Sequence, residues 1–329
     1  MQLTGYGITH QGNVRQNNED NFYLFGKYRK DVNLLTLEEE GEISDEKALV
    51  GVFDGMGGEE AGEIASLIAA EGVEPAVIEM AETEALKQLQ SINENVCREI
   101  IERNARVGTT AVLLYFDKSE VVSVNIGDSR AYCFRDDKLI RLSKDHSEGQ
   151  NMVENGMLSE EEAKKNNAWH KLIQYIGIFP EEFIIEPYST GRRQVNEGDL
   201  YLLCSDGLTD MLSDEDIASI IRKKGMDDLK ETAHLLLDSA LSSGGKDNVT
   251  IVLIRAEKQA PQNIRQQRGI RSIILGIILA AVLILGIVLG LKELISKNKE
   301  KEETQEIQPN VEETIETGVK EESSEEMIR

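Results

Sequence analysis

Short apolar runs of strand length alternate with polar turns in the middle of the chain. TAVLLYF (110–116) and VVSVNIG (121–127) are rich in β-branched and aromatic residues, and the polar stretch DKSE between them suits a hairpin. AYCFR and KLIRLS flank Asp136 and Asp137 in the same way. We therefore predict a meander of four consecutive strands, which favours antiparallel over parallel pairing.

The pattern outside this meander predicts further strands and two pairs of helices. Runs with strand character are ALVGVF (48–53), FIIEPYS (183–189), DLYLLCS (199–205) and VTIVLIR (249–255). Mixed apolar and charged residues at helical spacing predict helices over 59–72, 82–105, 214–224 and 227–242. Because the helices come in pairs and not one after each strand, we expect an α+β sandwich with helix pairs outside a sheet core. A doubly wound fold is disfavoured.

One long apolar stretch near the carboxyl end predicts a membrane span. IILGIILAAVLILGIVLGL runs from Ile273 to Leu291 without a charged residue, and at a rise of about 1.5 Å per residue it is close to 30 Å long. A buried core helix is the alternative, but a core helix of this length normally shows a polar face. We therefore predict a single transmembrane helix over 273–291.

The orientation of this helix is not decided by its flanks, because basic residues stand on both sides of it. The amino terminus MQLTGYGITH lacks the basic flank and apolar core of a signal peptide. We expect residues 1–258 to form a cytoplasmic domain, 259–272 a polar linker, and 292–329 an acidic, disordered tail outside the cell.

Charge restricts the classes of partner. The chain of 329 residues carries a net charge of −24, and residues 1–258 hold 27 basic against 48 acidic side chains. This balance argues against a nucleic-acid partner. A site for a phosphorylated substrate would need locally bound cations to reverse the sign of the field. The three cysteines show neither metal-ligand nor disulfide spacing, which fits a reducing compartment.

Four short acidic motifs stand beside the apolar, strand-like runs. They are NNED (17–20), FDGMGG (53–58), CSDGLTD (204–210) and GGKDNVT (244–250). Hard cations such as Mg²⁺ and Mn²⁺ need several oxygen ligands, and carboxylates at strand ends can converge on one ion. Each motif alone could be a turn. The set predicts one metal site built from Glu19, Asp20, Asp54, Asp206 and Asp247, with Arg15 placed to bind a phosphate.

Seven motifs in order resemble the PP2C-type metal-dependent serine/threonine protein phosphatases, and the membrane helix resembles that of bacterial membrane-anchored members. The motifs are VRQNNEDN, VFDGMGG, GTTAV, NIGDSRAY, KDHS, LLCSDGLTD and GGKDNVT. The resemblance covers residues 1 to about 256. It implies a four-layer α-β-β-α sandwich of two antiparallel sheets flanked by helix pairs, and hydrolysis of phosphoserine and phosphothreonine on proteins by a water that two metal ions activate.

The resemblance also implies roles for individual residues. A pair of Mn²⁺ or Mg²⁺ ions is held by Asp54, Asp206, Asp247 and the Gly55 carbonyl, while Glu19 and Asp20 complete the shell largely through water. Asp128 and Asp210 form a third, weaker site together with Asp206. Arg15 binds the phosphate, and Arg15, Asp20 and Asp54 form the catalytic set. Residues 147–177 correspond to the flap segment, in which Trp169 and His170 are expected to pack at the base and His146 to be structural.

Two other functions stay open at this point. The altered sequence of the flap segment would suit a phosphatase-like module that senses phosphoproteins with low turnover. Another two-metal phosphoester hydrolase, such as a phosphodiesterase, would use the same ions and water. The expected partners are phosphorylated proteins and a membrane serine/threonine kinase as the opposing enzyme.

Overall fold

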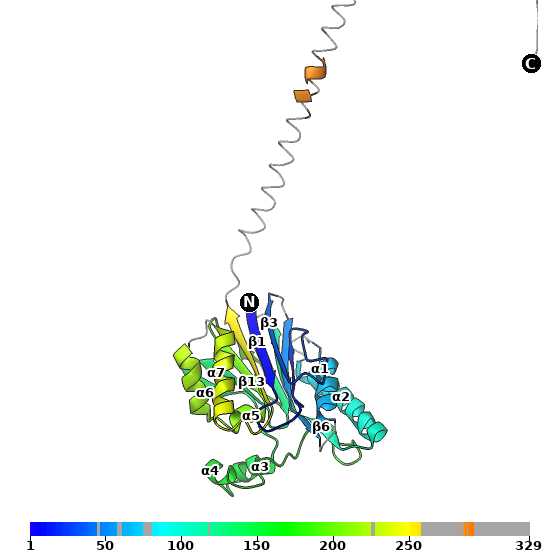
Figure 1. The fold of residues 1–329 in the computed structure, drawn as a ribbon, viewed down its shortest axis with the longest axis vertical. Helices are drawn as coiled ribbons and strands as arrows, with labels where there is room; N and C mark the ends of the chain where they lie inside the picture. Colours follow the sequence, from blue (N-terminus) through cyan, green and yellow to red (C-terminus); the bar gives the residue numbers. More distant parts are fainter. Residues whose placement is uncertain are drawn as a thin grey trace, which may run out of the picture. The chain divides into compact units, whose positions relative to one another are not determined.

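The computed structural model describes residues 1–44, 47–57, 61–74, 81–117, 119–224 and 228–257, together with 284, 286, 287 and 289–292. The chain divides into two units, Met1–Ala260 and Pro261–Arg329. The first unit contains all the sheets and helices that position the site (Figure 1).

The described strands form two large antiparallel sheets and a two-stranded one. The first sheet has the order β10-β9-β13-β14-β1-β3, and the second has the order β11-β8-β7-β4-β2 with β12 also paired to β8. β5 and β6 pair separately. The strands are β1 (Gln2–His10), β2 (Asn21–Leu24), β3 (Thr36–Ile43), β4 (Lys47–Phe53), β5 (Gly55–Gly57), β6 (Val107–Thr109), β7 (Ala111–Asp117), β8 (Glu120–Ile126), β9 (Arg130–Arg135), β10 (Lys138–Arg141), β11 (Tyr188–Ser189), β12 (Arg193–Gln194), β13 (Leu200–Cys204) and β14 (Val249–Glu257).

The helices cover the outer faces of the sandwich in pairs. Figure 1 shows α1 and α2 on one side of the sheets and α6 and α7 on the other, while α3 and α4 lie beyond the end of the sandwich that holds β6 and α5. The helices are α1 (Gly62–Gly72), α2 (Ala81–Arg103), α3 (Glu148–Glu154), α4 (Glu160–Ala163), α5 (Asp206–Thr209), α6 (Asp214–Lys224) and α7 (Leu229–Ser242).

Strand periodicity explains the layers. Alternate residues of a strand point to opposite faces, and both faces of the central strands are buried. In β14, Val252 and Ile254 pack in the core between the two sheets, whereas Ile251 and Leu253 pack in a separate core beneath α6 and α7. β4 divides in the same way between the central core and a third core beneath α1 and α2. The α+β sandwich with two antiparallel sheets is therefore confirmed.

The four-strand meander was a wrong prediction, although both of its hairpins form. β7 pairs with β8 and β9 pairs with β10, but β8 belongs to the second sheet and β9 to the first. Gly127, with φ of 96°, follows β8 directly and allows the chain to turn across to the other sheet. Alternating hydrophobicity is the same in both sheets, so the sequence pattern could not reveal this change of sheet.

Two further strand predictions differ from the structure. Only Tyr188–Ser189 of the predicted run 183–189 forms a strand, because Phe183 and Ile184 are exposed and Pro187 has no backbone donor. β1 was not predicted, since Gly5 and Gly7 interrupt its apolar pattern. A Cβ at Gly5 would lie 2.7 Å from side-chain atoms of Ile254 and Leu24, so packing between the sheets requires glycine there.

The described residues contain no helix that is long and apolar enough to span a membrane. Most of the predicted span 273–291 lies outside the described residues, as do the linker 259–272 and the tail from residue 293 onward. The membrane helix and the disordered tail stay predictions.

Candidate metal centre

A cavity of about 690 Å³ opens at the end of the sandwich nearest to α5 and the flap segment. Most of the predicted site residues line it, although they come from distant parts of the chain. They are Arg15, Glu19, Asp54, Gly55, Asp128, Asp206, Asp210 and Asp247. Asp20 is absent from this lining and is buried behind it, at 1% exposure.

The end of β4 places Asp54 in the cavity. The Asp54 backbone N–H donates to Thr110 Oγ1 at 3.0 Å, and the Thr110 N–H donates to the Asp54 carbonyl at 2.9 Å. These two bonds fix the chain where it passes from β4 into β5. A Cβ on Gly55 would lie 2.4 Å from the Glu19 carbonyl oxygen, so only glycine allows this approach.

A side chain that sequence reasoning missed, Asn248, joins two of the acidic motifs. Its Oδ1 accepts from the Glu19 N–H at 2.8 Å, and its Nδ2 donates to the carbonyls of Gln11 and Asn17 at 2.9 and 2.8 Å. The Asn248 N–H also donates to Oδ1 of Asp247 at 2.8 Å. Asn248 therefore fixes Asp247 relative to Glu19. The Asp-Asn dipeptide directly before the predicted strand 249–255 was the sequence signal that could have identified Asn248.

Asp20 is held by hydroxyl groups from the ends of two strands. Its Oδ2 accepts from Ser205 Oγ and from Thr250 Oγ1, both at 2.7 Å. Its backbone carbonyl accepts from the buried Arg29 guanidinium at 2.8 Å. Burial raises the pKa of Asp20 to about 7 despite these two donors. This environment orients the carboxyl group and makes an ionised Asp20 dependent on nearby positive charge.

The other acidic side chains raise one another's pKa values. The pKa of Asp54 is raised well above its ordinary value by burial and then by the charges of Asp20 and Asp206. The pKa of Asp206 is likewise raised by burial and then by Asp128 and Asp210. Partly buried carboxylates that repel one another in this way are a suitable donor set for divalent cations. The residues present therefore fit the predicted metal ions.

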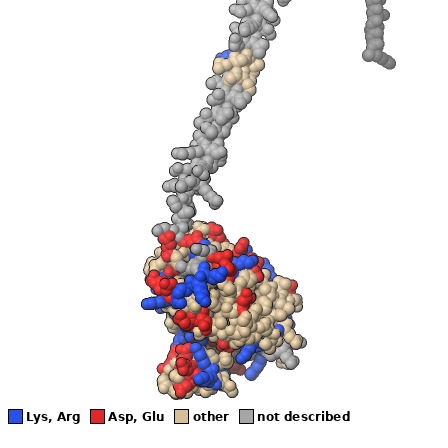
Figure 2. Space-filling model, turned by 60° about the vertical axis from the view of Figure 1, so that its left-hand side comes forward, with Lys and Arg blue, Asp and Glu red and all other residues tan. Residues whose placement is uncertain are grey.

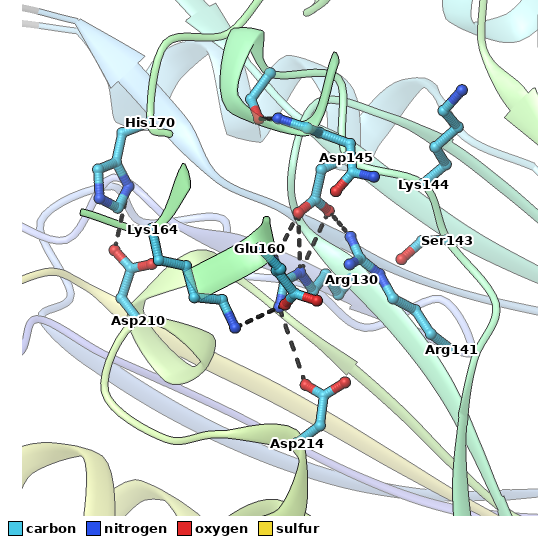
Figure 3. A network of polar contacts seen from close by, with 12 residues as sticks. Arg130, Arg141, Ser143, Lys144, Asp145, Glu160, Lys164, His170, Asp210 and Asp214 are labelled. Carbon is cyan, nitrogen blue, oxygen red and sulfur yellow. Dashed lines mark hydrogen bonds and ion pairs between the residues drawn. The ribbon is translucent and has the colours of Figure 1, made fainter. Parts of the chain in front are cut away.

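A buried ion-pair network supports the loop that carries Asp128. Arg130 donates to Asp145 from Nη2 at 2.7 Å and from Nε at 3.1 Å, and Arg141 contacts the other oxygen of the same carboxylate. Figure 3 shows Asp145 between the two arginines, with Arg130 also directed toward Asp214 at 4.0 Å. The network joins the Asp128 loop to the start of the flap segment.

His170 lies in a different place from the one the sequence predicted. Its side chain is 54% exposed, and its Nδ1 lies 3.4 Å from Oδ2 of Asp210 (Figure 3). One ligand atom each from His170, Asp206 and Asp210 lie within 4.8 Å of one another. Trp169, by contrast, is buried as predicted, at 8% exposure. Hydrophobicity alone does not predict which of two neighbouring side chains in a short turn is buried. No sequence signal identified His170 as a possible metal ligand.

Arg15 reaches the edge of the cavity. Its Nη2 lies 2.7 Å from Oδ2 of Asp247, and both side chains are partly exposed.

His146 is part-buried, accepts a hydrogen bond from the Gly127 N–H at 3.1 Å, and does not line the cavity, which agrees with a structural role.

All three cysteines are buried, and burial raises the pKa of Cys133 to about 11 and that of Cys204 to about 12. None of these thiols is placed or activated as a nucleophile.

Comparison with known proteins gives concordant matches. The model of the family described as Protein phosphatase 2C matches residues 40–241. A serine/threonine phosphatase, stp, of Listeria welshimeri is 31% identical over 262 residues, which are 75% of this chain and 93% of the relative.

Solved structures agree with these matches. The crystal structure of the Mycobacterium tuberculosis serine/threonine phosphatase PstP/Ppp has a TM-score of 0.64 and 31% identity, over 78% of this chain and 100% of that one. The catalytic domain of PstP in complex with two manganese ions has a TM-score of 0.62 and 30% identity, again over 78% of this chain and 100% of that one.

Proposed function

The chain belongs to the protein phosphatase 2C family and is a metal-dependent serine/threonine protein phosphatase, and we propose that its acidic cavity is the catalytic centre. The observation that carries this proposal is the convergence of carboxylates from four distant motifs on one cavity, where burial and neighbouring carboxylates raise the pKa values of Asp54 and Asp206. The similarity to proteins named serine/threonine phosphatases favours this function over the other two raised by the sequence, a sensing module and a different two-metal hydrolase.

In this proposal Asp54, Asp206 and Asp247, with the carbonyl of Gly55, hold two Mn²⁺ or Mg²⁺ ions. When bound, these ions supply a nucleophilic water at neutral pH and neutralise charge on the phosphate. Glu19 lies on the cavity wall, where it can receive hydrogen bonds from water, whereas Asp20 acts from behind the wall. The burial of Asp54 and Asp206 keeps these carboxylates fixed before substrate arrives.

Arg15 binds the phosphate group of the substrate. Its guanidinium is anchored at one Nη by Asp247, so the remaining N–H groups are oriented and partly exposed beside the cavity. A planar, charged donor of this kind holds two phosphate oxygens in a fixed direction. Arg15 therefore aligns the phosphorus with the carboxylates that hold the ions.

A third ion would be held by Asp206 and Asp210 together with His170, and the predicted Asp128 lies on the same cavity. The His170 imidazole would add a ligand from the flap segment to two carboxylates of α5, those of its first residue, Asp206, and of its C-cap, Asp210. Because the His170 side chain is half exposed, this site would bind its ion more weakly than the main pair.

The chain is further proposed to be anchored in the cell membrane by residues 273–291, with the catalytic domain cytoplasmic and the tail extracytoplasmic. The support is the uncharged apolar run 273–291. A membrane serine/threonine kinase is the proposed opponent, since sharing a bilayer raises the effective concentration of both enzymes. Protease treatment of intact cells with an epitope on the tail tests this topology, and a protected tail would contradict it.

Substrate class is tested by presenting two phosphoesters to the full chain in mild detergent with Mn²⁺. A phosphothreonine peptide should release inorganic phosphate, whereas a phosphodiester such as bis(4-nitrophenyl) phosphate should be a much poorer substrate. Faster hydrolysis of the diester would contradict the assignment to protein substrates.

A further inference from the structure

A second hollow, of about 370 Å³, adjoins the metal cavity beside α5. It shares part of its lining with the metal cavity: His170, Asp210 and Asp247. Its outer wall includes Lys164 and Trp169 from the flap segment and Lys246 from the loop before β14. A substrate chain that lies in the metal cavity can therefore continue into this hollow, which we call the lysine groove.

The ammonium groups of the lysine groove are available to a ligand. Lys246 is exposed, and none of the ion pairs among the described residues includes it. Lys164 pairs with Glu160 at 2.7 Å, but the two side chains are 48% and 59% exposed. An exposed pair of this kind contributes little free energy, so an incoming anion can replace Glu160.

Apolar surface lies directly beside these charges. The Lys164 ammonium lies 5.7 Å from the centre of the Trp169 ring, and Met211 and Leu212 line the same hollow. An ammonium within about 6 Å of an aromatic ring centre is attracted by the ring face, so Trp169 helps to hold the Lys164 charge at the wall of the groove. The lysine groove therefore suits a side chain with an aliphatic stem and a negatively charged end.

The negative charge of the surrounding surface makes the lysine groove a distinct place for an acidic peptide to bind. Residues 1–258 carry 27 basic and 48 acidic side chains, so most of the surface repels an acidic peptide. Figure 2 shows Lys and Arg next to Asp and Glu on the lobe at the foot of the molecule, which holds α3 and α4. An acidic substrate gains attraction only where cations such as Lys164 and Lys246 stand next to the catalytic centre.

We propose that the lysine groove binds an anionic side chain of the substrate, a carboxylate or a second phosphate, close in sequence to the phosphoserine or phosphothreonine that is hydrolysed. Lys164 and Lys246 are thus specificity-determining residues. The inference rests on the phosphatase function and deepens it, because it names a substrate class: phosphoproteins whose target residue lies in acidic or multiply phosphorylated sequence.

The experiment uses the full chain in mild detergent with Mn²⁺ and a set of phosphothreonine peptides. The parent peptide has alanine around the phosphothreonine, and each derivative has one glutamate, or one non-hydrolysable phosphonate analogue of phosphoserine, at a single position on either side. The quantity measured is the ratio of kcat/KM for each derivative to kcat/KM for the parent. Preference for glutamate identifies a carboxylate ligand, and preference for the phosphonate alone identifies a second phosphate.

We expect a preference of about fivefold at one or two positions on one side of the phosphothreonine, which is typical of one partly exposed ion pair. The preference should weaken as salt is added. It should fall to about one in the double variant Lys164→Ala/Lys246→Ala and persist in the control Lys138→Ala on β10, an exposed lysine outside the groove.

Two results would overturn the inference: no preference at any position in the unmodified chain, or a preference that survives in the double variant. Failure of the phosphatase function itself would appear differently, as no phosphate release from the parent peptide by the unmodified chain.

Discussion

Arg130 and Asp145 form an ion pair inside the molecule, with Nη2 of Arg130 2.7 Å from Oδ2 of Asp145 and side chains only 7% and 4% exposed. Arg130 follows Asp128 by two residues, and Asp145 lies just before the flap segment. The pair therefore connects a carboxylate of the cavity to the segment that covers it.

Removal of one partner of this pair should destabilise the fold strongly. Asp145→Ala leaves the Arg130 guanidinium buried without its main acceptor, which costs about 3–5 kcal/mol. Urea unfolding followed by circular dichroism measures the change. Asp214→Asn is the matched control, because it removes the charge 4.0 Å from Arg130 but keeps an oxygen that can accept from the buried Tyr132 hydroxyl, and it should change stability by less than about 1 kcal/mol. Equal effects of the two variants would contradict this account of the network.

Metal removal should lower thermal stability, and one substitution should weaken that dependence. Burial and then repulsion by Asp128 and Asp210 raise the pKa of Asp206, and bound ions relieve this repulsion. Binding stabilises by about 2.7 kcal/mol when the metal is 100-fold above its Kd. Asp206→Asn removes one repelling charge, so in EDTA this variant should melt above the unmodified chain. With Mn²⁺ it should gain much less than the unmodified chain.

Differential scanning fluorimetry with and without Mn²⁺ measures both effects. A variant that melts lower than the unmodified chain in EDTA would show that Asp206 is not under electrostatic strain.

The weakest metal site should depend on His170. His170→Ala and Asp210→Asn each remove one ligand and should raise the Mn²⁺ concentration for the last phase of binding by about tenfold or more. Because both residues would act on the same ion, the double variant should show little further loss. Calorimetric Mn²⁺ titration measures this, with His234→Ala on α7 as the control. If the losses of Mn²⁺ affinity in the two single variants add up in the double variant, His170 and Asp210 do not act on the same ion.

Arg15 should act on the phosphate and not on the fold. Arg15→Ala removes charged hydrogen bonds to substrate and should lower kcat/KM for a phosphothreonine peptide by about tenfold to a hundredfold. Inorganic phosphate should inhibit the variant less well than the unmodified chain. Arg15→Lys should recover only part of the loss, because an ammonium cannot hold two oxygens in a plane. Unchanged inhibition by phosphate in Arg15→Ala would place the phosphate elsewhere.

Hydrophobic periodicity within short windows of the sequence predicted many of the strands and helices. The two hairpins, the strands β4, β13 and β14 and the four outer helices follow from periodicity, and the strand ends carry Asp54, Asp206 and Asp247 to one cavity. The crossing from β8 to β9 was missed because a buried strand has the same pattern in either sheet. β1 was missed because its glycines serve contacts between layers that no local pattern records.

The supporting side chains of the site were harder to predict than its carboxylates. Asn248 and Thr110 act through backbone hydrogen bonds across the fold, and His170 approaches Asp210 only through the path of the flap segment. Such roles depend on tertiary contacts between residues far apart in sequence. Acidic residues beside strands were recognisable because several of them together suggest one chemistry.

The most direct test of the catalytic centre is the release of inorganic phosphate from a phosphothreonine peptide by the full chain, measured with Mn²⁺, with EDTA, and with Asp206→Ala in Mn²⁺. The metal centre predicts activity with Mn²⁺, loss of that activity in EDTA, recovery when Mn²⁺ is added in excess, and at least about a hundredfold reduction in Asp206→Ala. Phosphate release that persists in EDTA, or an Asp206→Ala variant as active as the unmodified chain, would contradict it.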